Sequence, residues 1–160
     1  EDGVDVGPLV NAETRDKVAE FVEDAGRKGA TLELGGKAPE GKGFFYPPTV
    51  LSNVPETADC VHDEIFGPVA AIQTFTDQED VIRRANATEY GLVAYVFSED
   101  MKRALQVCER LEYGMVGLNR GLVSDPAAPF GGVKQSGLGR EGGHEGMLEF
   151  MEPQYISASW

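Results

Sequence analysis

The strongest constraint on the fold is an alternation of apolar strand patterns and amphipathic helix patterns between residues 69 and 118. Buried strands are expected at Val69 to Phe75, Leu92 to Phe97 and Met115 to Leu118, with one helix between each consecutive pair. Near-continuous apolar strands that alternate with helices are typical of parallel pairing with right-handed crossovers. The sequence therefore predicts an α/β fold with a parallel sheet and crossover helices.

Both crossover helices carry capping signals. Thr76 to Glu79 has the pattern of a capping box and opens a helix that runs to about Ala87. Ser98 is expected to cap the second helix, which ends at Gly114. The apolar stripe of this second helix comprises Met101, Ala104, Leu105, Cys108 and Leu111.

The first part of the chain predicts a helix with peripheral strands. Asn11 is placed to cap a helix that runs to about Lys28, and Gly29 suits the position after its end. The apolar face of this helix comprises Val18, Phe21, Val22 and Ala25. Thr31 to Leu34 then predicts a short strand, and Tyr46 to Leu51 predicts an extended segment.

The last third differs in kind, because Gly121 to Gly146 is rich in glycine. An ordered loop of this length in a compact domain is often functional. Glu145 to Met151 predicts a short helix, and the alternation in Tyr155 to Trp160 predicts a terminal strand. An exposed apolar edge at a terminus favours pairing with another chain.

Charge and composition exclude several classes of function. Fourteen basic residues against 27 acidic ones give a net charge of -13, which repels nucleic acid and anionic membranes. No apolar stretch has the length of a membrane span. The two cysteines are compatible with a reducing cytosol, so we expect a cytoplasmic protein. Glu1 to Gly3 shows neither an initiator methionine nor a signal peptide, and we expect the chain to begin inside a longer protein.

Cysteine and histidine chemistry is not favoured by the pattern. Gln106 to Cys108 resembles a nucleophile segment only superficially, since Cys108 lies in an apolar stripe where burial raises the pKa of a thiol. Cys60 is expected in a loop among acids, which disfavour a thiolate. His62 and His144 have no metal-binding spacing, so no metal site is expected. The glycines after Pro129 match neither a phosphate loop nor a dinucleotide fingerprint.

An acid and an aromatic residue precede the Gly-Pro pair at residues 67 and 68. Glu64 and Phe66 are two positions apart, so in an extended segment they share one side. A carboxylate can accept hydrogen bonds from a ribose diol while a ring packs on a flat base. A surface acid beside a core phenylalanine is the competing interpretation.

Four blocks occur together and in order: Gly7 to Val10, Asp63 to Pro68, Glu89 to Leu92 and Pro129 to Glu141. Together they resemble the C-terminal part of the aldehyde dehydrogenase superfamily, over essentially the entire chain. The stretch Gly114 to Gly137 is most similar to the succinate-semialdehyde branch of that family. The resemblance implies oxidation of an aldehyde to a carboxylate with NAD or NADP, through a cysteine thioester.

The resemblance also implies roles for individual residues. Glu64 matches the acid that holds the nicotinamide ribose, Phe66 matches the aromatic residue beside the nicotinamide, and Leu92 borders the cofactor. Phe130 matches an aromatic wall of the substrate tunnel. Ser124 matches the residue that hydrogen bonds the distal carboxylate of a semialdehyde, whereas no fixed role in the family attaches to Arg120.

By the same resemblance, residues 1–145 form part of a catalytic domain, and residues 146–160 form an arm that joins a neighbouring subunit of a homo-oligomer. The nucleotide-binding domain, the Gly-Gln-x-Cys nucleophile segment and the Glu-Leu-Gly-Gly base segment lie upstream of Gly7 in the family, and this chain is expected to contain none of them. The chain alone is therefore expected to be inactive. The alternatives are a dehydrogenase for glutarate semialdehyde or an aliphatic aldehyde, and a non-catalytic binding or assembly module.

Overall fold

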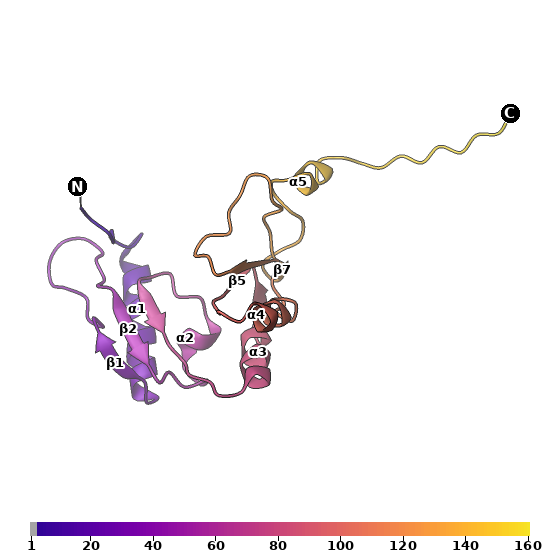
Figure 1. Ribbon diagram of the computed structural model, residues 1–160. Helices are drawn as coiled ribbons and strands as arrows, with labels where there is room; N and C mark the ends of the chain where they lie inside the picture. The colour runs from indigo at the N-terminus through magenta and orange to yellow at the C-terminus, as the bar shows by residue number, and fades with distance from the viewer. Residues whose placement is uncertain (1–2) are drawn as a thin grey trace. The chain divides into compact units, whose positions relative to one another are not determined.

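The computed structural model describes residues 3–160, which form two compact units, 3–76 and 77–160 (Figure 1). Glu1 and Asp2, with which the expected catalytic part begins, lie outside the described residues. The division expected at residues 145 and 146 concerns the arm of an assembled enzyme and stays a prediction. None of the helices in the described part of the chain combines the length and the apolar character of a membrane span.

Unit 1 begins with the long helix that the sequence predicts. Helix α1 spans Ala12–Arg27, and the Asn11 side chain accepts a hydrogen bond from the Thr14 N–H at 2.8 Å. Gly29 follows the C-cap with a φ of 109°, a conformation that favours glycine. The helix and both of its predicted end signals are confirmed.

A three-stranded sheet accompanies α1, in the order β1 (Thr31–Leu34), β2 (Thr49–Ser52), β3 (Val69–Ala71). Strands β1 and β2 are antiparallel, whereas β2 and β3 are parallel. The short helix α2 (Asp59–His62) lies between β2 and β3 in the chain. The core of unit 1 is one cluster from α1, β2, α2 and the intervening segments: Val18, Phe21, Val22, Ala25, Tyr46, Leu51, Val54, Ala58 and Cys60.

Unit 2 contains the second parallel pair. Strands β5 (Val93–Val96) and β6 (Met115–Leu118) are parallel and are joined by helix α4 (Met101–Cys108), which contacts both. The remaining elements are the helix α3 (Gln78–Asn86), the short antiparallel pair β4 (Tyr90–Gly91) and β7 (Val133–Lys134), and the helix α5 (Glu145–Leu148). The mixed α and β content is as predicted.

The single parallel sheet expected from the strand order is not present in residues 3–160. Strand β3 pairs with β2, through hydrogen bonds such as Ile72 N–H to Leu51 O at 2.9 Å. It is also shorter and less buried than predicted, since Ile72 and Phe75 beyond its end are exposed. The alternation of strands and helices predicts parallel pairing but does not identify the partner, which in this case comes from earlier in the chain.

Both crossover helices begin later than predicted. The N-caps are Asp77 and Asp100, whose carboxylates accept from the N–H groups of Glu79 and Arg103, both at 3.0 Å. Thr76 and Ser98 are therefore not the caps. An aspartate suits this position because its negative charge also interacts favourably with the helix dipole.

The apolar stripe predicted on α4 is mostly not buried. Ala104 is buried, but Met101 and Leu105 are exposed and Cys108 is half-buried. Cys108 was expected in the core, and that expectation is wrong.

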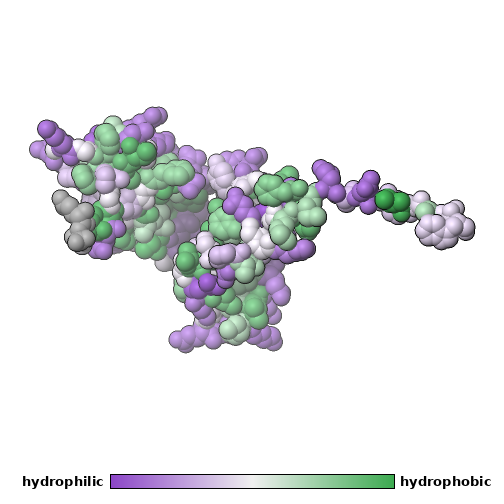
Figure 2. Space-filling model, turned by 90° about the horizontal axis from the view of Figure 1, so that it is seen from above, coloured by the Kyte–Doolittle hydropathy of each residue, from purple (hydrophilic) through white to green (hydrophobic). Residues whose placement is uncertain are grey.

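The predicted terminal strand at Tyr155 to Trp160 is not formed. Residues 151–160 have neither helix nor strand and are exposed throughout, and Figure 1 draws them as an extended segment. In Figure 2 hydrophobic atoms are visible on this segment and elsewhere on the surface. A strand needs a hydrogen-bonding partner, and none of the described residues supplies one.

Candidate functional site

Glu64 and Phe66 line one cavity of about 360 Å³ in unit 1, whose other wall is α1 and the residues before it. Between them Ile65 packs against the apolar core. This alternation confirms that the two side chains share one side of an extended segment. Phe66 is 68% exposed, so the interpretation as a core phenylalanine is wrong.

Two close contacts fix the backbone of this segment. The Thr49 N–H of β2 donates to Pro68 O at 2.8 Å. A Cβ atom on Gly67 would lie 2.6 Å from Val18 Cγ2 of α1, so a larger residue would have to displace a fully buried side chain. The Gly-Pro pair therefore holds Glu64 and Phe66 at a set distance from the core of unit 1.

The chemistry of this cavity fits a nucleoside. No described residue donates a hydrogen bond to the Glu64 carboxylate or forms an ion pair with it, so its oxygens remain available to a diol. The Phe66 ring is exposed, and Val10, Val18 and Phe21 give the cavity apolar walls. An acceptor beside flat apolar surface is what a ribose and its attached ring require.

The other expected site residues lie in unit 2. Leu92 and Phe130 line one cavity of about 470 Å³, formed largely by the glycine-rich loop. Phe130 also borders a second cavity of about 220 Å³, together with Val123 and Asp125. Ser124, which lies between these last two residues, is exposed and lines neither cavity. The structure thus places Leu92 and Phe130 in the wall of the same cavity, whereas Ser124 lies outside both cavities.

The glycine-rich loop is ordered by contacts with itself. Phe130 and Glu141 exchange two backbone hydrogen bonds, each 2.7 Å long. Arg140 Nη1 donates to Gly132 O at 2.8 Å and to Gly139 O at 2.6 Å. The loop therefore closes on itself and presents the Phe130 ring, as the prediction of an ordered loop requires.

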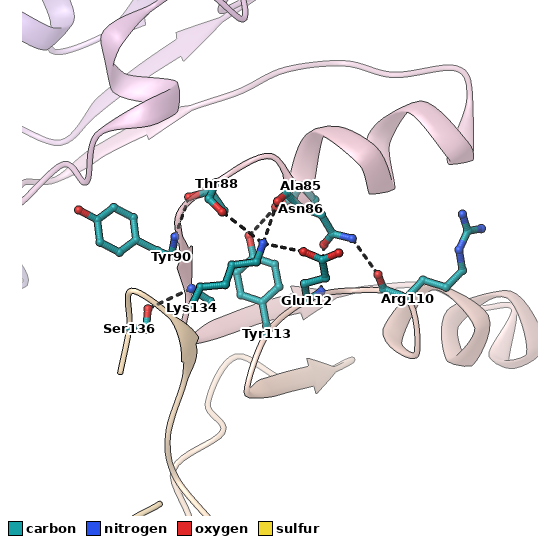
Figure 3. A network of polar contacts seen from close by, with 10 residues as sticks. Ala85, Asn86, Thr88, Tyr90, Arg110, Glu112, Tyr113, Lys134 and Ser136 are labelled. Atoms are coloured by element: carbon teal, nitrogen blue, oxygen red, sulfur yellow. Dashed lines mark hydrogen bonds and ion pairs between the residues drawn. The ribbon is translucent and has the colours of Figure 1, made fainter. Parts of the chain in front are cut away.

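Lys134 attaches this loop to the rest of unit 2 (Figure 3). Its Nζ donates to Asn86 O at 2.9 Å and Thr88 O at 3.2 Å, and pairs with Glu112 Oε2 at 2.7 Å. Nearby, Ser136 Oγ accepts from the Gly91 N–H at 3.0 Å. Sequence reasoning tested Lys134 only as a phosphate-loop lysine and missed this role.

Further hydrogen bonds around Lys134 stabilise the same region of unit 2. Asn86 Nδ2 donates to Arg110 O at 2.8 Å, and Asn86 Oδ1 accepts from the Glu112 N–H at 2.9 Å. Tyr113 OH donates to Ala85 O at 2.7 Å (Figure 3). Asn86 thus links the end of α3 to the segment after α4.

Neither cysteine is placed as a reactive thiol. Cys60 lies in α2 and is buried, not in a loop as expected. Desolvation, assisted by the nearby Asp24 and Asp59, raises the pKa of its thiol. Cys108 is half-buried in α4. Among residues 3–160, no group of three or more histidine, cysteine, aspartate or glutamate side chains is placed to hold a metal ion.

The letters Glu-Leu-Gly-Gly also occur in this chain, at residues 33–36, but the base segment of the family lies upstream of Gly7, and its expected absence stays a prediction. Glu33 lies in β1, where its carboxylate accepts a short hydrogen bond from Ser52 Oγ of β2. Gly35 and Gly36 form the turn after β1, with φ values of 72° and 83°. The segment therefore belongs to the edge strand β1 and to the residues that follow it, and we assign no catalytic role to Glu33.

The chain matches the family model described as "Aldehyde dehydrogenase family" over residues 1–156. It is 54% identical over 94% of its length to a succinate-semialdehyde dehydrogenase of Paenarthrobacter nicotinovorans, of which it covers 34%. It is 47% identical over 99% of its length to a glutarate-semialdehyde dehydrogenase of Pseudomonas putida, of which it covers 33%. The chain thus spans about a third of the length of these relatives.

Solved structures agree with these matches. An NADP-dependent enzyme of Escherichia coli superimposes with a TM-score of 0.92 at 47% identity, over 95% of this chain and 32% of that one. An NAD+ complex of an aldehyde dehydrogenase from Bacillus cereus superimposes with a TM-score of 0.88 at 39% identity, over 95% and 31%. One of these two structures is named for NADP and the other for NAD+, which are the two cofactors that the resemblance implies. The chain belongs to the aldehyde dehydrogenase family.

Proposed function

We propose that the chain is the C-terminal third of an NAD(P)-dependent dehydrogenase that oxidises succinate semialdehyde to succinate. The observation that carries this proposal is the 54% identity to a succinate-semialdehyde dehydrogenase over nearly the whole chain. The geometry supports it, because an acceptor with an exposed ring lines one cavity and an aromatic wall lines another.

In the proposed reaction a cysteine thiolate attacks the aldehyde carbon to give a thiohemiacetal. Loss of a hydride would convert this into a thioester, which a water molecule activated by a glutamate hydrolyses. Nicotinamide, when bound, supplies the hydride acceptor. We assign neither the thiolate nor the glutamate to this chain. Its own residues bind and orient. In unit 1, Glu64 accepts from the ribose diol and Phe66 packs beside the nicotinamide. In unit 2, Leu92 borders the cofactor and Phe130 walls the aldehyde tunnel.

Ser124 is proposed to donate a hydrogen bond to the distal carboxylate of the substrate. Its hydroxyl is exposed, and no described residue engages it. Replacing Ser124 by alanine in the complete protein is expected to weaken binding of succinate semialdehyde by about 0.5–3 kcal/mol. An uncharged aldehyde such as butanal should be spared, and equal losses for both substrates would contradict this role.

Glutarate semialdehyde is the second candidate substrate, because a relative that is 47% identical is named for it. The kcat/KM values of the complete protein for succinate semialdehyde, glutarate semialdehyde and butanal decide among these substrates. A preference for butanal would indicate an aliphatic aldehyde dehydrogenase.

A non-catalytic binding or assembly module is the alternative from another class. The purified 160-residue chain, incubated with succinate semialdehyde and NAD+ or NADP+, is expected to produce no reduced cofactor, whereas the complete protein is expected to turn over. A complete protein that binds cofactor without turnover would support the module. Stoichiometric production of reduced cofactor by the chain alone would overturn its predicted inactivity.

The C-terminal segment is proposed to act as an oligomerisation arm. Tyr155, Ile156 and Trp160 are all exposed, which leaves an apolar segment free to pair with the sheet edge of a second copy. Sedimentation of the complete protein should show a homo-oligomer that dissociates when residues 151–160 are removed. A compact monomer with an ordered tail would count against pairing.

The cytoplasmic location of the protein stays a prediction.

A further inference from the structure

Arg120 differs from every other arginine that the structure describes. Each of the others has an acidic or carbonyl partner, whereas no described residue forms an ion pair or a hydrogen bond with Arg120. Those partnered arginines are Arg15, Arg27, Arg83, Arg84, Arg103, Arg110 and Arg140. The Arg120 side chain is exposed, so its guanidinium donors are available to a ligand.

The backbone that carries Arg120 is fixed. The preceding Asn119 has a φ of 52°, and its N–H donates to Val96 O at 2.8 Å. Its carboxamide accepts from the Ser98 N–H and donates to Ser98 O, both at 2.8 Å. These hydrogen bonds hold the turn after β6 against the end of β5, and they therefore fix the backbone position from which the Arg120 side chain extends.

Arg120 lines the cavity of about 220 Å³ that Phe130 also borders. Val123 and Met115 add apolar surface to the same cavity. A guanidinium presents paired donors that match a carboxylate, and apolar walls suit a short aliphatic chain. The cavity therefore suits an aliphatic carboxylate.

Asp125 is the acid in this cavity, and its carboxylate accepts from the Ala127 N–H at 2.9 Å. It forms no ion pair with Arg120. Its negative charge opposes an anionic ligand in the cavity, so Asp125 provides a second test of the electrostatic argument.

We propose that Arg120 binds the carboxylate of an ω-semialdehyde acid and thereby selects this substrate class over uncharged aldehydes. This inference rests on the proposed function. Succinate semialdehyde and glutarate semialdehyde, for which the two relatives are named, both carry a carboxylate at the end opposite the aldehyde. Arg120 lines the cavity that Phe130 borders, where it presents a positive charge to that carboxylate.

The test measures kcat/KM of the complete protein for succinate semialdehyde and for butanal, in wild type, Arg120→Gln and Arg120→Lys. Arg120→Gln is expected to lower the value for the semialdehyde by about 10- to 100-fold, mainly through KM, because a charge-assisted hydrogen bond is lost. Butanal should change by less than about twofold. Arg120→Lys should recover part of the loss, since it keeps the charge but not the paired donors.

Activity with butanal also reports whether each variant folds. Against a wild type that prefers the semialdehyde, an equal loss for both substrates, or no loss for either, overturns the role of Arg120 alone. A wild type without such a preference overturns the proposed substrate and this inference with it. Asp125→Asn should raise kcat/KM for the semialdehyde without changing that for butanal, and a selective fall would contradict the electrostatic argument.

Discussion

Each of the two units is stabilised internally by a different kind of interaction. In unit 1, α1, β2 and α2 bury one continuous cluster of apolar side chains, which includes Phe21 and Leu51. In the described part of unit 2, only Ile82 and Ala104 are fully buried apolar residues. Unit 2 relies instead on side chains that bond backbone carbonyls and on glycines that allow backbones to touch. Apolar patterning therefore specifies unit 1, whereas unit 2 depends on particular polar contacts.

This difference extends to the proposed binding residues of each unit. Gly67 and Ile65 contact the core of unit 1 and thereby position Glu64 and Phe66. Phe130 lies in the glycine-rich loop. This loop is held by hydrogen bonds within its own backbone and by the hydrogen bonds of Lys134. Changes in the core of unit 1 should therefore affect Glu64 and Phe66, and changes in the polar contacts of unit 2 should affect Phe130.

The largest expected effect is in the core of unit 1. Leu51 is 1% exposed, so Leu51→Ala should lower the free energy of unfolding of this unit by about 2–5 kcal/mol. The matched change in unit 2, Leu105→Ala, removes a half-exposed side chain and should cost less than about 1 kcal/mol. Urea denaturation followed by amide hydrogen exchange measures both, and similar costs would contradict the comparison.

The next effect concerns backbone packing in unit 2. A Cβ atom on Gly114 would collide with Gly131 O and lie 2.8 Å from Gly132 Cα, so Gly114→Ala should destabilise unit 2 by about 1–3 kcal/mol. Gly121→Ala is the control, because a Cβ atom there would meet nothing within 4 Å. The control should stay within about 0.5 kcal/mol of wild type. Equal unfolding midpoints for the two variants would show that the loop does not need this close approach.

Loss of the lysine contacts should have a somewhat smaller effect. Lys134→Met removes donors to two carbonyls and the pairing with Glu112, at a cost of about 1–2 kcal/mol. Amide exchange at Gln135 and Gly91, whose N–H groups bond Glu89 O and Ser136 Oγ, should accelerate. The amides of α1 should be unchanged. Lys102→Met, at an exposed lysine of α4, is the control and should leave both sets of amides as in wild type.

The smallest effect is a dependence on pH in unit 1. The Asp59 N–H and the Lys28 ammonium hold the pKa of Asp24 below its ordinary value of 3.8. The resulting stabilisation is present above that ordinary value and is lost as the pH falls through the lowered pKa of the folded state. The stability advantage of wild type over Asp24→Asn should therefore shrink below about pH 4. A constant difference between wild type and Asp24→Asn across this range of pH would contradict this assignment.

The local features of unit 1 could be predicted from its sequence. The cap at Asn11, the turn at Gly29 and the shared side of Glu64 and Phe66 each depend on residues that are neighbours in the chain. The pairing of β3 with β2 was not predicted, because many partners satisfy the same apolar strand. The exposure of Phe66 was left open for the same reason, since alternation gives a side but not its burial.

Unit 2 was harder to predict because its contacts are distant in sequence. Lys134 bonds carbonyls 46 and 48 positions upstream, and no local pattern marks such partners. The capping box at Thr76 failed by one residue, since Asp77 competes for the same role with a charged acceptor. The unpartnered state of Arg120 follows from the fold alone.

The most direct test of the roles proposed for the two units compares KM for cofactor with KM for semialdehyde in the complete protein. Glu64→Gln should raise KM for the nicotinamide cofactor and leave KM for succinate semialdehyde nearly unchanged. Lys134→Met, which loosens the Phe130 loop, should raise KM for succinate semialdehyde more than KM for the cofactor. If both variants raise both constants to the same extent, the assignment of separate roles to Glu64 in unit 1 and to the Phe130 loop in unit 2 is wrong.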